Sequence, residues 1–141
     1  MGGGVTRFLE AGRAPVSLRV PFAASSVALA RQQLRDWMRA AGHSRDCIED
    51  ARVVISEMVG NSVRHAAPLT DGTILVGWAA ERRGLRISVT DGGSPSRPVK
   101  VNAASSDLSG RGMAIVETLA DTWWSERTRS RSTVSAVVRL H

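Results

Sequence analysis

Cysteine, lysine and tyrosine are nearly or wholly missing from this 141-residue chain: Cys47 and Lys100 are single occurrences, and tyrosine is absent. With one cysteine no intramolecular disulfide can form, so a reducing compartment, the cytoplasm, is expected. No apolar run approaches the roughly 20 residues that span a bilayer, so no membrane segment is expected. The first residues also lack the apolar stretch of a secretory signal.

Negative charge is in deficit, and the formal net charge is +6. Nearly all of the positive charge is arginine. The arginines are scattered along the chain and aromatic residues make up only 4% of it, so direct binding of nucleic acid is not expected. The planar guanidinium suits phosphate and carboxylate groups, which favours a nucleotide or an acidic protein as partner.

The length predicts one domain, with a flexible Gly-rich segment at 1–14 and a folded domain at 15–141. The pattern of apolar residues and turn signals predicts an α+β fold, in which one mostly antiparallel sheet carries helices on one face. The expected strands are 16–20, 74–78, 85–89, 122–128 and 132–140. The expected helices run from a cap at Ser25 or Ser26 to about 41, from a cap at Ser44 to about 66, and from 112 to about 121. Gly42 is the expected stop of the first of them.

Glu57, Asn61 and His65 recur every fourth residue on the second predicted helix. They lie on the side away from its expected core positions, which are Ile48, Ala51, Ile55, Met58, Val59 and Ser62. A carboxylate, an amide and an imidazole therefore line up on three successive turns. An asparagine oxygen is a good neutral ligand for Mg²⁺, and a glutamate one turn away can accept a proton from an attacking hydroxyl. A solvated helix face would show the same spacing, so the stripe gains meaning only from the motifs downstream.

Asp91-Gly92-Gly93 ends a predicted strand with one acid and two glycines. A carboxylate in this position can accept a hydrogen bond from the exocyclic amine of adenine, and glycine lets the backbone approach a flat ring closely. An ordinary Asp-Gly turn is the simpler interpretation of these three residues alone.

Gly110-Arg111-Gly112-Met113 precedes a short apolar helix. Glycines at a helix N-terminus expose backbone N–H groups where the helix dipole favours anions, and Arg111 can add a charge-assisted bond to phosphate. No strand stands directly before this Gly-x-Gly, as a Rossmann fingerprint requires, and no P-loop motif is present.

Together the three segments resemble the motifs of the GHKL ATPases. Residues 57–66 resemble the N box, residues 91–93 the first glycine box and residues 109–114 the second, in the same order and with similar spacing. The resemblance covers about residues 16–140. Within the superfamily, the short chain and the N box are similar to the bacterial anti-sigma-factor serine kinases.

This resemblance implies the Bergerat fold, a two-layer α/β sandwich that binds ATP and Mg²⁺ beneath a lid, here residues 94–109. Asn61 would hold Mg²⁺, Glu57 would be the catalytic base, and Asp91 and Gly93 would bind adenine, with Thr133 supporting Asp91. The remaining residues assigned to ATP by their motifs are His65, Gly110, Arg111, Gly112 and Met113.

The implied activity is phosphorylation of a serine in an anti-anti-sigma (STAS-type) protein, with a sigma factor as second partner and a homodimer as a possible assembly. Three positions depart from the family pattern. Pro95 replaces a glycine after the first box, and Ala114 replaces one in the second. Leu108 replaces an arginine aimed at the γ-phosphate. An ATP-gated binding module without kinase activity is therefore the alternative, and a histidine-kinase fragment is disfavoured because little sequence precedes the domain.

Overall fold

A computed structural model describes residues 14–93 and 111–141 of the chain. The predicted flexible segment at 1–14 lies almost entirely outside the described residues. The predicted lid at 94–109 also lies outside them, and with it Pro95, Leu108 and Gly110.

Five strands of the described chain form one sheet in the order β1-β2-β3-β5-β4. All four pairings between neighbours are antiparallel, as alternating apolar and polar residues predict for a sheet with one buried face. The strand bounds are Val16–Pro21 for β1, Thr73–Ala80 for β2, Leu85–Asp91 for β3, Ala120–Arg127 for β4 and Ser132–Val138 for β5.

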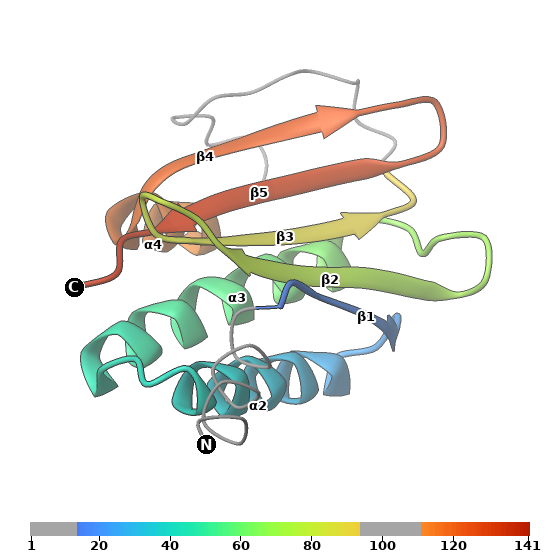
Figure 1. Cartoon of the computed structure of the whole chain (residues 1–141). Coiled ribbons are helices and arrows are strands. Elements are labelled where there is room, and N and C mark those ends of the chain that lie inside the picture. The colour runs from blue at the N-terminus through green and yellow to red at the C-terminus, as the bar shows by residue number, and fades with distance from the viewer. Residues whose placement is uncertain (1–13, 94–110) are drawn as a thin grey trace.

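The helices of the described chain are α2 (Ser25–Ala40), α3 (Arg45–His65) and α4 (Arg111–Leu119). Figure 1 shows α2 and α3 packed as a layer against one face of the sheet. Helix α3 contacts α2 and α4 as well as β3 and β5, so it is the central helix of this layer. The predicted two-layer α+β architecture is confirmed.

The ends of the helices follow from their local sequence, with one exception. Ser44 caps α3 by accepting a hydrogen bond from the Cys47 N–H at 3.2 Å, and Gly42 after α2 has the positive φ of 83° that favours glycine. The predicted cap of α2 is wrong. Helix α2 has no side-chain cap, and Ser26 instead donates its hydroxyl proton to the Pro21 carbonyl at 2.6 Å, since the sharp exit from β1 leaves that carbonyl within reach.

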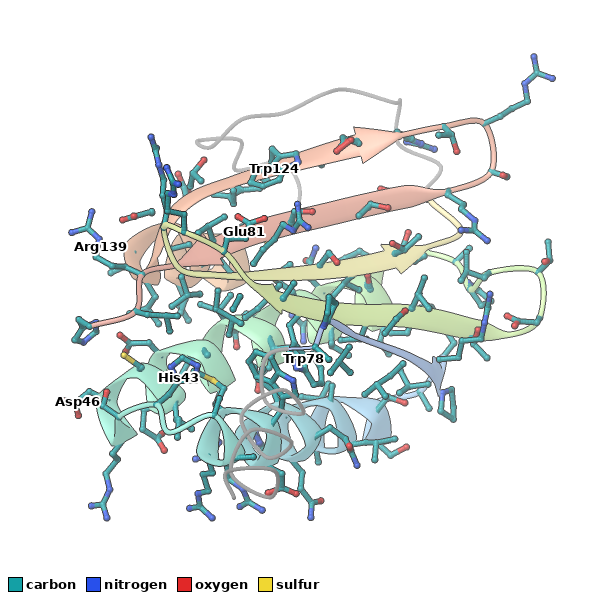
Figure 2. All side chains as sticks on the ribbon, in the orientation of Figure 1. His43, Asp46, Trp78, Glu81, Trp124 and Arg139 are labelled. Carbon is teal, nitrogen blue, oxygen red and sulfur yellow. The ribbon has the colours of Figure 1, made fainter. Side chains whose placement is uncertain are left out.

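The core lies between the sheet and the helices. The positions of α3 that the helical period assigned to the core are all buried, which fixes the rotation of this helix. Trp78 of β2 points toward α2, where its ring meets Trp37 edge to face at 6.4 Å (Figure 2). The buried positions of α3 that were predicted are Ile48, Ala51, Ile55, Met58, Val59 and Ser62.

None of the helices in residues 14–93 and 111–141 combines the length and the apolarity that a crossing of the bilayer requires.

Candidate functional site

Helix α3 presents the predicted polar stripe away from its buried face. Glu57 and Asn61 are half-buried, and His65, the last residue of the helix, is exposed. Glu57 forms no ion pair with any residue in the described part of the chain. Among residues 14–93 and 111–141, its carboxylate is therefore not committed to an ion-pair partner. The ATP contact predicted for His65 stays a prediction.

Asp91 is the most deeply buried acid of the site, with 5% of its surface exposed. One carboxylate oxygen accepts a hydrogen bond from the Ser62 hydroxyl of α3, and the other accepts one from the Gly93 N–H at 2.8 Å. Burial raises the pKa of Asp91 above its ordinary value, while these two hydrogen bonds and the charge of Arg127 act in the opposite direction. The carboxylate is thus held in one orientation, with acceptor capacity left for a ligand.

The turn after β3 is fastened to the end of α3 by two backbone hydrogen bonds. The Ala67 N–H donates to the Gly93 carbonyl, and the Gly92 N–H donates to the Ala67 carbonyl, each at 2.8 Å. A side chain at Gly92 would overlap the carbonyl oxygen of Pro68, and Gly93 has a φ of 90°. Both glycines are therefore required by the backbone, and the segment with Asp91 is placed against α3 through them.

Gly92→Ala is expected to lower the free energy of unfolding by an amount at the upper end of about 1–3 kcal/mol, because the added methyl group forces the link between β3 and α3 apart. Urea denaturation followed by circular dichroism measures this change. Gly72→Ala is the comparison, since Gly72 has open space around it, and its φ of 82°, which Gly92 does not share, makes alanine costly there without any overlap. A cost at Gly92 no larger than the cost at Gly72 would contradict this role.

Thr133 does not lie where the sequence placed it. Its hydroxyl is bonded to that of Thr90 at 2.9 Å, and Thr90 is the direct register partner of Thr133. Because side chains alternate along a strand, this pair occupies the face of the sheet opposite to Asp91, which points toward α3. The predicted support of the Asp91 carboxylate by Thr133 is therefore wrong.

Ser132 is the residue that faces Asp91 across the β3–β5 ladder. It precedes Thr133, so the error is a shift by one residue, which exchanges the two faces of a strand. The signal was present in the sequence: Val134 and Val138, which pack against the core, share the parity of position 132 and not that of 133.

The second glycine box begins helix α4. Met113 is 2% exposed and packs in the hydrophobic core, so a contact of this residue with phosphate would come from its backbone N–H. Helix α4 includes Arg111 and Gly112 at its start, whereas Gly110 lies outside the described residues. Helix α4 packs against α3.

Asn61 has a side-chain oxygen whose surroundings suit the binding of a cation. Its Oδ1 is buried, and it has no hydrogen-bond partner in the described part of the chain. A buried oxygen without a partner is costly in free energy, and Mg²⁺ prefers oxygen ligands of this kind. The described residues contain no cluster of three or more His, Cys, Asp and Glu side chains that could hold a metal by themselves, so the amide fits a metal that phosphate oxygens also ligate.

Comparisons with known proteins agree on one family. The family model described as histidine kinase-like ATPase domain matches residues 20–140. The serine-protein kinase RsbW of Listeria monocytogenes serotype 4a is 30% identical over 118 residues, which cover 75% of each chain. The RsbW of Staphylococcus aureus strain JH9 is 43% identical over 51 residues, 36% of this chain and 32% of that protein.

The fold agrees with a solved structure as well. The crystal structure of the RsbU and RsbW domains of a Mycobacterium tuberculosis protein superposes with a TM-score of 0.69 and 25% sequence identity. The superposition covers 90% of this chain and 32% of that longer chain.

Proposed function

Since the chain belongs to the histidine kinase-like ATPase domain family and resembles its anti-sigma-factor kinases, we propose that it binds Mg-ATP and transfers the γ-phosphoryl group to a serine of an anti-anti-sigma, STAS-type protein. The observation that carries the ATP site is the Asp91 carboxylate, buried and oriented by Ser62 and Gly93. A fixed acceptor beside a glycine-lined turn matches the amine edge of adenine.

The residues of α3 would act on the phosphate end of the nucleotide. Asn61 would contribute its buried Oδ1 to Mg²⁺, which when bound offsets the negative charge of the phosphates. Glu57 lies one turn earlier on the same face of the helix. It would accept the proton of the serine hydroxyl as the hydroxyl attacks the γ-phosphorus, with ADP as the leaving group.

Asn61→Ala is expected to remove most of the Mg²⁺ dependence of ATP binding, because the variant loses a buried oxygen that has no hydrogen-bond partner among the described residues. Calorimetric titration with ATP, with and without Mg²⁺, measures the ratio of the two affinities. Gln32→Ala, at an exposed position of α2, controls for loss of an amide. An unchanged ratio in the Asn61 variant would overturn the metal assignment, and absence of ATP binding by the wild type at millimolar concentration would overturn the proposed function.

A second candidate function rests on Leu108, which stands where the kinases similar to this chain carry an arginine aimed at the γ-phosphate. Without that cation the domain would bind ATP and use it to select a protein partner, for example a sigma factor, without phosphorylating it. The two functions differ in one measurable quantity, the transfer of labelled phosphate to the partner. Substitution of Glu57 is therefore informative, because it should greatly slow phosphate transfer in the first candidate function and leave the second unchanged.

A further inference from the structure

Arg127 lies in one row across the sheet with Ser132 and Asp91. In the sheet, Arg127 of β4 pairs with Ser132 of β5, and Ser132 pairs with Asp91 of β3. Paired residues of an antiparallel sheet point to the same face. The arginine side chain therefore lies on the helix side of the sheet, at the strand ends where the buried carboxylate of Asp91 points toward Ser62.

The guanidinium of Arg127 lies against Gly93. Its Nη2, Nε and Cζ atoms are 3.5, 3.7 and 3.8 Å from the position that a Cβ atom on Gly93 would occupy. A Cβ on Gly93 would thus be in van der Waals contact with three atoms of the plane, so the guanidinium lies alongside the open side of this glycine as a whole group. Under the proposed function, Gly93 is the residue past which the purine ring approaches Asp91.

The charge of Arg127 also acts on this part of the site, because its attraction favours the ionised form of Asp91. The other arginines of the same hairpin, Arg129 and Arg131, are exposed, whereas Arg127 is half-buried. A half-buried guanidinium is well suited to stack on an aromatic ring, since it is planar and more weakly hydrated than an ammonium group.

We propose that Arg127 forms a wall of the purine site and packs its guanidinium on the ring of the bound base, acting as a positioning residue for the nucleotide. This inference rests on the proposed ATP-binding function. A wall that touches the base contributes the same amount to the binding of adenosine, ADP and ATP, whereas a cation that touches phosphate contributes more as phosphates are added. The length of the phosphate chain therefore separates the two roles.

The test compares the affinities of adenosine, ADP and ATP for the wild type and for Arg127→Ala, measured by displacement of a fluorescent ATP analogue. The Arg127→Ala variant is expected to bind all three about 3- to 30-fold more weakly, by the same factor for each. Arg129→Ala removes the same charge from an exposed position of the hairpin and is expected to leave all three affinities unchanged. Thermal unfolding by circular dichroism confirms that each variant is folded.

Arg127→Lys keeps the charge and loses the plane, and it is expected to recover less than half of the lost binding free energy. Full recovery by lysine would overturn the stacking contact, because charge alone would then suffice. A loss that grows from adenosine to ATP would move the contact to the phosphates, and tighter binding by the alanine variant would mean that Arg127 obstructs the site. An unchanged affinity alongside normal ATP binding by the wild type would overturn the inference and leave the proposed function intact.

Discussion

Asp91→Asn is expected to weaken ATP binding on the order of 10- to 100-fold, because the charged acceptor for the adenine amine is replaced by an amide. Shape is conserved, so the Gly93 N–H can still donate to Oδ1 and the new amide can donate to the Ser62 hydroxyl. Isothermal titration with ATP measures the loss. Asp36→Asn, on the exposed side of α2, is the control, and an unchanged affinity in the Asp91 variant would remove adenine recognition from this residue.

The same substitution is expected to leave the fold at least as stable as the wild type at pH 7. Burial raises the folded-state pKa of Asp91, so the carboxyl group stabilises the fold in its protonated form. That contribution is complete below the unfolded-state pKa and is lost as the pH rises through the folded-state pKa. The asparagine side chain is neutral at every pH. The difference in free energy of unfolding between the variant and the wild type, measured by urea denaturation, should therefore shrink as the pH is lowered. A difference that grows on acidification would contradict this assignment.

Glu57→Gln is expected to slow phosphoryl transfer by about 10²- to 10⁴-fold while the affinity for ATP stays the same, because the amide cannot accept the serine proton. The measurement follows ³²P from labelled ATP into an anti-anti-sigma protein under single-turnover conditions. Glu49→Gln lies two turns earlier on α3, where the glutamate pairs with Arg52 at 2.6 Å, and it should transfer at the wild-type rate.

One result would contradict the role of Glu57, and another would contradict the kinase function. Equal rates for the Glu57 and Glu49 variants would remove the base from position 57. Absence of transfer by the wild type, combined with tight ATP binding, would favour the ATP-gated binding module, in which Leu108 leaves the γ-phosphate without its cation.

The fold was predictable from the sequence because its signals are local. The cap at Ser44, the stop at Gly42 and the apolar stripe of α3 depend on residues within a few turns of each other, and the structure contains all three. The cap predicted for α2 failed because Ser26 bonds to a carbonyl of the preceding strand, an alternative that only the path of the chain between β1 and α2 reveals.

The residues of the site were predictable only where they belong to a sequence motif. Ser62 was assigned to the core side of α3 by the helical period, which is correct, but its bond to Asp91 joins residues 29 apart in the sequence. Thr133 failed by one position because the prediction followed the residue type of the motif and did not use the parity of Val134 and Val138, which fixes the face of the strand. Arg127 belongs to no motif, and its position beside Gly93 follows from the pairing of three strands.

The hydrogen bond between Ser62 and Asp91 fixes the distance along α3 between the proposed adenine site and the proposed phosphate site. In the proposed function, the adenine ring binds near Ser62, and Asn61 and Glu57 come earlier on the same helix. At a rise of about 1.5 Å per residue, Glu57 lies about 7.5 Å from Ser62 along the helix axis. Because α3 is one uninterrupted helix, this spacing does not stretch. A nucleotide with a shorter phosphate chain would bind near Ser62 and would not reach Glu57.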